Sequence, residues 1–286
     1  MRRFINELKL KYRDNLVVRV VFFLPIKVKN WLEYRSFRRR VDVRKLNYFK
    51  MRHRDERCFI IGNGPSLLPS DLEKISNMVT FASNRIYELY DSVRWRPNYW
   101  ICVDPYIIED DAKIIASLPG VKFVSYSSKK QGIIDDEDLF YIFNKQEFYL
   151  NKYKTDRNVG FSKDPSAYLA AGETVTYTAI QLAIYMGFKE IYLLGCDHSY
   201  SVSVGKDGRV KRDDTIKDHF SKAKSEAYVI QNKVISQKAY ERARQQGEEK
   251  EVCIYNATRG GCLEVFPRVN FDSLHFLDGV DDDNPK

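Results

Sequence analysis

The sequence predicts an α/β fold of the Rossmann-like class, with a mostly parallel sheet covered by helices on both faces. Two observations indicate it. Short apolar runs, typical of buried parallel strands, alternate with helical segments along the chain. A glycine turn at residues 62–64 follows one such run, Cys58–Ile61, and leads into a helix start. The chain has 286 residues, 44% of them hydrophobic, which is enough for one large domain or two small ones.

The N-terminal residues differ from the rest of the chain in charge. Residues 1–57 hold 18 Lys and Arg against six Asp and Glu, a net charge of +12, so the remaining residues carry −4 of the total of +8. Their apolar run, Leu16–Ile26, is about half the length that spans a bilayer. Because no small-residue cleavage site follows it, we do not expect secretion.

We therefore expect residues 1–56 to form a basic, helical, amphipathic arm. Aromatic residues are interleaved with its basic ones, which favours an anionic membrane surface as the partner of residues 1–50. An arm packed on the body, or on a second subunit of a homo-oligomer, is the alternative. No nucleic-acid-binding motif is present, so a nucleic-acid partner is not expected.

The glycine turn suggests a ligand site. Two glycines around an Asn allow positive φ and let a ligand approach the backbone. Ser70 is a candidate helix cap, with Glu73 as its capping-box partner. A helix start with free N–H groups suits an anion such as a phosphate. The turn is neither a full G-x-G-x-x-G pattern nor a P-loop.

The first half continues with alternating strands and helices. The expected strands are 78–82, 98–103 and 121–125, and the expected helices are 69–77 and 107–117. Polar residues follow three successive strands: Asn63, Asn84 and Asp104. Because the carboxyl ends of parallel strands share one edge of a sheet, these residues should converge on one rim. Residues 127–165 are irregular and suggest a connecting lobe or a lid.

The second half holds another strong stretch. Thr174–Thr178 cap a helix that ends at Gly187, and a buried strand over 191–194 ends in Gly195-Cys196-Asp197-His198. Polar residues 201–218 indicate a mobile loop. A long helix over 221–246, a strand over 252–255, a glycine turn over 256–261 and an acidic tail follow.

The cysteines indicate a reducing compartment. There are five, without a C-x-x-C pair, and most stand in strand-like apolar runs. Neither Cys nor His shows the spacing of a structural zinc site, so no metal site is expected.

The motifs resemble a known superfamily. The GNGPSL stretch after a strand, Asn84 after the next strand, and the T-x-T stretch followed by a helix and GFKEIYLLGCD are similar to bacterial family 42 sialyltransferases. The flagellin-modifying motility accessory factors and the 6-hydroxymethylpterin diphosphokinase MptE-like proteins carry a related domain. The resemblance covers about residues 57–270. Val175 and Asp104-Pro105 depart from the sialyltransferase pattern, and the latter resembles the MptE-like and accessory-factor branch.

The resemblance implies roles for individual residues. The residues it places at the nucleotide and donor sugar are Gly62, Asn63, Gly64, Ser66, Asn84, Asp104, Thr174, Thr176, Gly195, Asp197 and Tyr200. Tyr200 is the one nearby candidate for the tyrosines that bind the donor phosphate. His219, on a mobile lid before the final helix, is the implied general base. An imidazole that titrates near neutrality suits deprotonation of an acceptor hydroxyl.

The resemblance also implies a function and a domain plan. We expect a bacterial glycosyltransferase that transfers a nucleotide-activated sugar, foremost a CMP-sugar, to a surface glycan or glycolipid of lipopolysaccharide or capsule. It would need no cofactor and act in the cytoplasm, peripherally at the inner membrane face. A pterin pyrophosphokinase that uses ATP and Mg²⁺, with Asp104 and Asp197 as metal ligands, is one alternative. A non-catalytic nucleotide- or glycan-binding module is another. The expected units are an arm (1–56), a catalytic domain (57–275, lid about 199–220) and an acidic tail (276–286).

Overall fold

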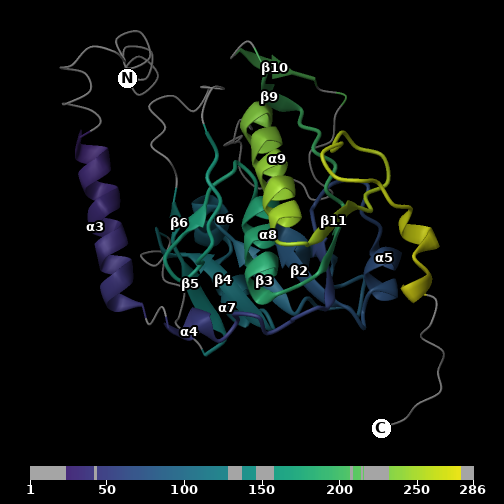
Figure 1. The fold of residues 1–286 in the computed structure, drawn as a ribbon, viewed down its shortest axis with the longest axis horizontal. Coiled ribbons are helices and arrows are strands. Elements are labelled where there is room, and N and C mark those ends of the chain that lie inside the picture. Colours follow the sequence, from purple (N-terminus) through teal and green to yellow (C-terminus); the bar gives the residue numbers. More distant parts are fainter. Residues whose placement is uncertain are drawn as a thin grey trace.

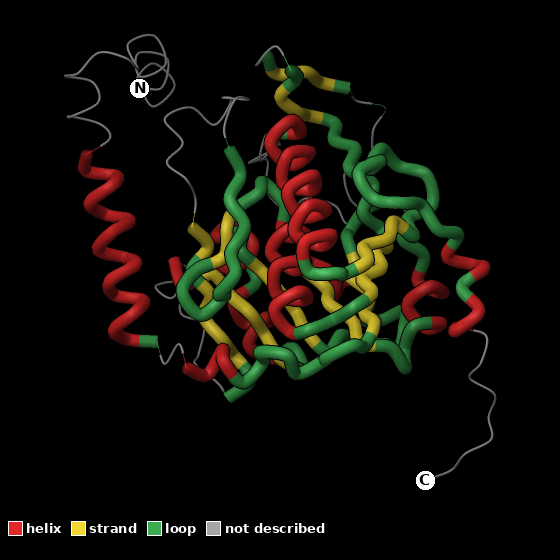
Figure 2. Tube along the Cα trace, viewed as in Figure 1, coloured by secondary structure: helices red, strands yellow, loops and turns green. Residues whose placement is uncertain are grey.

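The centre of the fold is one parallel sheet of seven strands (Figures 1 and 2). The computed structural model describes residues 24–41, 44–127, 137–145, 158–206, 209–213, 215 and 232–277. The strands are β1 (Arg57–Ile61), β2 (Val79–Ser83), β3 (Tyr99–Cys102), β4 (Val121–Ser125), β5 (Leu139–Ile142), β8 (Glu190–Leu194) and β11 (Cys253–Asn256). Their order is β11-β8-β1-β2-β3-β4-β5, and every neighbouring pair is parallel. The Rossmann-like prediction is confirmed.

Each central strand is apolar throughout because it buries side chains on both faces of the sheet. In β1, Cys58 and Ile60 belong to one hydrophobic cluster, and Phe59 and Ile61 belong to the other. This alternation follows from the two-residue period of a strand. A continuous apolar run is therefore the pattern of a strand between two helical layers.

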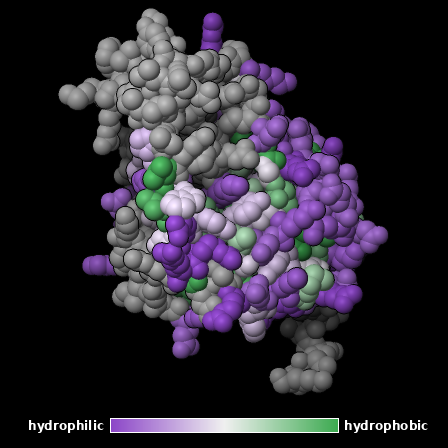
Figure 3. Space-filling view, turned by 60° about the vertical axis from the view of Figure 1, so that its left-hand side comes forward, coloured by the Kyte–Doolittle hydropathy of each residue, from purple (hydrophilic) through white to green (hydrophobic). Residues whose placement is uncertain are grey.

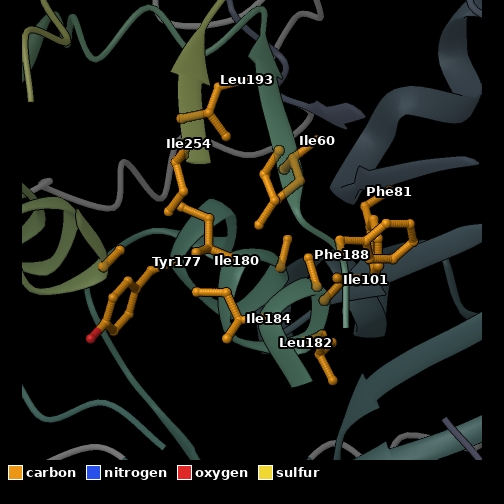
Figure 4. Close-up of a cluster of buried hydrophobic side chains, with 14 of the residues drawn as sticks. Ile60, Phe81, Ile101, Tyr177, Ile180, Leu182, Ile184, Phe188, Leu193 and Ile254 are labelled. Atoms are coloured by element: carbon orange, nitrogen blue, oxygen red, sulfur yellow. The ribbon is translucent and has the colours of Figure 1, made fainter. Parts of the chain in front are cut away.

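The first layer consists of α8 (Val175–Met186), α9 (Lys233–Glu249) and the segment around α4 (Arg44–Asn47). The side chain of Thr174 caps α8, and Gly187 ends it with φ of 93°, so both predicted ends are confirmed. Figure 4 shows α8 side chains such as Ile180 and Ile184 packed beneath Ile60 and Ile254 of the strands.

The second layer consists of shorter helices: α5 (Pro69–Lys74), α6 (Pro105–Asp110), α7 (Ala112–Ser117) and the 3₁₀ segments η2 (Asn84–Leu89), η4 (Phe271–Ser273) and η5 (His275–Leu277). The prediction of one helix over 107–117 is wrong, because the chain leaves helical geometry at Asp111. Its buried carboxylate accepts hydrogen bonds from Arg85 Nε and Tyr87 Oη, both at 2.7 Å. These two hydrogen bonds fix Asp111 in its non-helical conformation between α6 and α7.

Part of the N-terminal arm packs on the body. In α3 (Leu24–Arg40), Phe37 is fully buried against Tyr126 and Phe143, and Ser36 Oγ lies 2.9 Å from Tyr126 Oη. Beyond α4, Phe49 is buried in the first layer. The packing alternative therefore holds for these described arm residues; residues 1–23 lie outside the described ranges. No helix in the described ranges is both long and apolar enough to cross a bilayer.

Two loop predictions need correction. The irregular region, 127–165, contains β5 and β6 (Asn144–Lys145), and β6 pairs with β7 (Leu169–Ala170), which lies just beyond it. The expected mobile loop at 201–218 contains an antiparallel hairpin of β9 (Val202–Val204) and β10 (Val210–Arg212). Val202 and Val204 are buried, so the hairpin is anchored by its inward-facing valines.

Candidate functional site

Most of the predicted site residues that the structure describes gather where the strand order reverses. From β1 the chain proceeds outward through β2, β3, β4 and β5, and then returns to β8 on the other side of β1. The turns that follow β1 and β8 therefore start side by side at the carboxyl edge of the sheet. In open α/β sheets, ligands bind in the crevice at such a switch point.

The two turns touch through glycine backbone. Gly64 N donates a hydrogen bond to Gly195 O at 2.9 Å, and Gly62 N donates to Leu194 O at 2.8 Å. A Cβ on Gly62 would lie 2.3 Å from Gly195 O. Neither Gly62 nor Gly64 has a positive φ, so that part of the prediction is wrong. The glycines are required because the neighbouring turn approaches so closely; Gly195, at φ of 66°, is the one in the left-handed region.

Asp197 is the central polar side chain of this junction. It is 8% exposed, and its Oδ2 accepts a hydrogen bond from Ser66 Oγ at 2.7 Å. The same Oδ2 would lie 1.7 Å from a Cβ on Gly64. Its backbone oxygen accepts from Cys262 N, in the turn after β11, at 2.7 Å. Asp197 thus joins three strand-end turns.

Asn63 and Asn84 carry buried amide oxygens that have no partner among the described residues. Asn63 Nδ2 donates to Ser83 O at 3.0 Å, which leaves its Oδ1 as the group without a hydrogen bond in the described structure. Asn84 has φ of 50°, and its backbone oxygen accepts from Trp100 Nε1 at 2.9 Å. Its Oδ1 is also buried and has no partner among the described residues. The ends of the neighbouring strands β1 and β2 therefore each present a buried acceptor oxygen without a partner among the described residues. Because buried polar atoms in native proteins are almost always hydrogen-bonded, these two oxygens indicate a missing partner such as a ligand.

The start of α8 lies beside the same junction. Thr174 Oγ1 accepts from Thr176 N at 3.3 Å and lies 3.4 Å from the hydroxyl of Tyr240 in α9. Thr176 Oγ1 lies 4.0 Å from the sulfur of Cys196, the residue before Asp197. Both predicted threonines thus stand close to the β8 turn. Sequence reasoning missed Tyr240, because an aromatic residue in a long amphipathic helix carries no local signal of a site.

His198 and Tyr200 complete the turn after β8. His198 is 5% exposed and has φ of 52°, and its ring packs edge-on against Tyr200 and Tyr240, with centroids 5.7 and 5.4 Å away. Burial, assisted by the charge of Lys233, lowers the pKa of His198 to about 4. The prediction of a strand-end packing residue agrees with this buried, neutral ring.

Asp104 does not join the cluster. It follows β3, which β2 separates from β1, and its Oδ1 accepts from Tyr106 N at 2.8 Å as the cap of α6. The predicted base, His219, lies outside the described residues. Within the described ranges, no group of three or more His, Cys, Asp or Glu side chains could hold a metal ion.

The start of α5 is not open to an anion, contrary to the prediction. Asp71, not Ser70 or Glu73, serves this end: its Oδ2 accepts from Leu68 N at 3.1 Å. Asp71 is 1% exposed and pairs with Arg259, whose Nη1 lies 2.6 Å from Oδ2. The protein's own carboxylate therefore fills the position expected for a phosphate.

Comparisons with known proteins give similar solved structures and one family match. A Maf glycosyltransferase from Magnetospirillum magneticum AMB-1 has 17% sequence identity and a TM-score of 0.49, over 80% of this chain and 38% of that one, so this chain spans well under half of its length. The sialyltransferase CstII from Campylobacter jejuni, solved in complex with a substrate analogue, cytidine-5'-monophosphate, has 16% identity and a TM-score of 0.45, over 76% of this chain and 85% of that one. No curated protein matches the chain. Residues 33–203, more than half of the chain, match one protein family, and the chain belongs to that family, described as 6-hydroxymethylpterin diphosphokinase MptE-like.

Proposed function

We propose that this protein is a glycosyltransferase that binds a nucleotide-activated sugar, foremost a CMP-sugar, at the junction of the β1 and β8 turns. One observation carries the proposal. At the switch point of the sheet, the glycine turn closes on the Asp197 turn, and beside it Asn63 and Asn84 keep buried amide oxygens without partners in the described structure.

The free acceptors favour the nucleoside part of a donor over its phosphate. An amide oxygen accepts hydrogen bonds, and an ionised phosphate offers none. Ribose hydroxyls and the exocyclic amino group of cytosine are donors. A buried acceptor without a partner costs about 1–3 kcal/mol, so a ligand that supplies a donor gains that energy back. Because Asn63 Nδ2 is held by Ser83 O, its Oδ1 is the atom left for the ligand.

The phosphate and the reacting carbon would lie toward α8. The start of this 12-residue helix carries Thr174 and Thr176 and the positive end of its dipole. Hydroxyl and backbone donors there would stabilise the charge that develops on the leaving phosphate. His219 would take the proton of the acceptor hydroxyl as that oxygen attacks the anomeric carbon, and the nucleotide would leave with the bonding electrons. Tyr200, beside His198, would line this side of the donor.

We further propose a surface glycan or glycolipid as the acceptor, with the protein peripheral at the inner membrane face. No cofactor is required for this transfer.

A pyrophosphokinase is the second candidate, because the family description names a pterin diphosphokinase. It would need Mg²⁺ to hold the ATP phosphates, and Asp104 and Asp197 were its expected ligands. Those residues follow β3 and β8, which stand three strand spacings apart, or about 14 Å. Mg²⁺ binds its ligands at about 2.0–2.1 Å, so one ion would not join both carboxylates at that separation. The geometry therefore favours the glycosyltransferase.

Nucleotide binding tests the proposal directly. The thermal midpoint of the full chain is measured with CMP, CDP, UDP, GDP, ATP and GTP, each with and without Mg²⁺. A ligand at a hundred times its Kd stabilises the native state by about 2.7 kcal/mol. We expect CMP to stabilise without metal, and Asn63→Ala to remove most of that effect. Stabilisation by ATP only with Mg²⁺ would instead support the pyrophosphokinase.

Turnover then separates an enzyme from a binding module. The protein is incubated with CMP-activated sugars and a set of glycolipid acceptors, and release of CMP is followed. Acceptor-dependent release supports the transferase. Binding of CMP without any release, over all acceptors, would favour a non-catalytic module.

A further inference from the structure

We propose that the outer face of α3 is a docking surface for an anionic lipid membrane. The face is defined by residues one helical turn apart on the side opposite the body: Val28, Trp31, Leu32, Arg35 and Arg39. All five are exposed, and Val28, Trp31 and Leu32 are 44%, 53% and 54% exposed. The proposal needs no assumption about the reaction, because it rests on this face alone.

One face of α3 packs on the body and the opposite face is exposed. Tyr34 and Phe37 point to the body, where Tyr34 packs edge-on against Phe143 with centroids 5.1 Å apart. Positions 28, 31, 32, 35 and 39 follow the spacing of a single stripe, roughly opposite to them. A helix that only packed on the body would expose polar residues there. This one exposes a Trp, a Leu and a Val.

The charges on α3 identify the partner. The helix holds six Lys and Arg against one acidic residue, Glu33. Arg35 lies over the Trp31 ring, with Cζ 4.6 Å from its centroid. Basic side chains beside an exposed Trp and aliphatic residues match the boundary of an anionic bilayer, where the apolar groups enter and the arginines meet the headgroups. A protein partner would not require this excess of positive charge.

The start of α3 lies at the same end of the molecule as the candidate site. Figure 1 shows the start of α3 at the upper side of the molecule, where the β9–β10 hairpin also lies. Residues 51–55 form backbone hydrogen bonds with the end of α8, which lies at the lower side of the molecule in Figure 1, and β1 begins just after them. The parallel strands therefore run upward in this view, and the candidate site at their carboxyl ends lies at the upper edge of the sheet. Figure 3 turns the α3 side forward and shows exposed hydrophobic side chains between strongly hydrophilic ones.

The chain offers a specific spectroscopic probe. It has three tryptophans, of which Trp95 and Trp100 are 3% and 1% exposed, whereas Trp31 is half exposed. Entry of α3 into a bilayer should therefore shift the emission of Trp31 to the blue, while the two buried indoles stay unchanged. Trp31→Phe should abolish the shift and retain most of the binding, since Phe is also apolar.

Vesicle binding by the full chain tests the proposal. The probes are phosphatidylcholine vesicles with and without phosphatidylglycerol, and the readouts are co-sedimentation and the emission shift. We expect binding to the anionic vesicles only. Trp31→Gln with Leu32→Gln should weaken it by at least about tenfold. Arg35→Gln with Arg39→Gln should weaken it by about thirtyfold, and more at low salt than at high salt.

The matched control removes the same kinds of side chain elsewhere. Tyr48 and Ile114 are 65% and 40% exposed and lie outside α3, so Tyr48→Gln with Ile114→Gln should bind like the wild type. The proposal is overturned if the Trp31 and Leu32 variant binds anionic vesicles as tightly as the wild type. It is also overturned if binding depends on residues 1–23 alone, or if duplex DNA but no vesicle is bound. None of these results bears on whether CMP stabilises the protein.

Discussion

Ser66 Oγ donates a hydrogen bond to Asp197 Oδ2 at 2.7 Å, across 131 positions of sequence. The bond joins the turn after β1 to the turn after β8, and Asp197 continues through its backbone to the turn after β11. The candidate site is therefore a junction of three strand ends, and its shape depends on contacts that no single segment contains.

A double-mutant cycle on Ser66 and Asp197 should detect this junction. Ser66→Ala leaves the largely buried carboxylate without its hydroxyl donor, and we expect the free energy of unfolding to fall by about 1–3 kcal/mol. With Asp197→Asn the two effects should not add, with a coupling of about 1 kcal/mol. Urea titration measures both. Ser92→Ala, an exposed serine with a local bond to Leu89 O, is the control and should change little. Strict additivity would mean that the bond does not form in solution.

Gly64→Ala should disturb the site through contact alone. The new methyl would lie 1.7 Å from Asp197 Oδ2, so the carboxylate must move and the junction must open. We expect CMP stabilisation to be lost. Gly260→Ala is a matched control: φ is 66° there, and its Cβ meets nothing within 4 Å among the described atoms. It should cost about 1 kcal/mol of stability through backbone strain and leave nucleotide binding intact. Equal binding by both variants in a thermal-shift titration would contradict this role for Gly64.

The elements that the sequence predicts well are those with local signals at both ends. The helix α8 has a capping Thr174 and a terminal Gly187, and the strands β1 and β8 are apolar runs that end in glycine. β5 was missed, because it stands at the edge of the sheet within an irregular, charged region. Its four residues, Leu139–Ile142, nevertheless form an apolar run like those of the central strands, and three of the four are buried.

The site was predictable in composition but not in its contacts. The convergence of Asn63 and Asn84 follows from the carboxyl-edge rule for parallel strands. That Asp71 fills the expected phosphate position depends on Arg259, which is 188 residues away. Pairings at such separations have no local pattern, and neither does the approach of Tyr240 to Thr174.

Arg259 should contribute strongly to stability. It binds both oxygens of the buried Asp71 and also reaches Asp272, which joins α5 to the C-terminal η4 segment. Arg259→Met leaves that carboxylate buried without its cation, and we expect a loss of about 3 kcal/mol. Arg54→Met removes a pair between two exposed side chains, Arg54 and Asp55, and should cost at most about 1 kcal/mol. The free energy of unfolding at neutral pH measures both, and similar losses would refute the special role of Asp71.

His198 should make stability depend on pH. Burial lowers the pKa of His198 from 6.5 to about 4, so between these values the unfolded chain binds a proton that the folded chain does not. Stability must therefore fall as the pH drops from about 6.5 to about 4, by about 3 kcal/mol in total. His198→Asn, which tolerates a positive φ, should remove this part of the acid sensitivity. Urea titrations at about pH 7 and about pH 4.5 compare the two proteins. If the free energy of unfolding differs between the two pH values by the same amount in the wild type and the variant, His198 is not the group that titrates.

The pH profile of turnover should distinguish the two histidines of the site region. His219, the proposed base, must be neutral to accept the acceptor's proton, so kcat/KM should fall on the acid side of the pH profile as this imidazole takes up a proton. If His198 were the base, its lowered pKa would place the acid limb of the pH profile near pH 4. We expect His219→Ala to lower kcat by about a hundredfold or more and to abolish the acid limb of the profile. CMP stabilisation should persist in this variant, because the base does not hold the nucleotide. An acid limb near pH 4 that His198→Asn abolishes would instead assign the role of general base to His198. Its burial would then be the feature that keeps the base neutral.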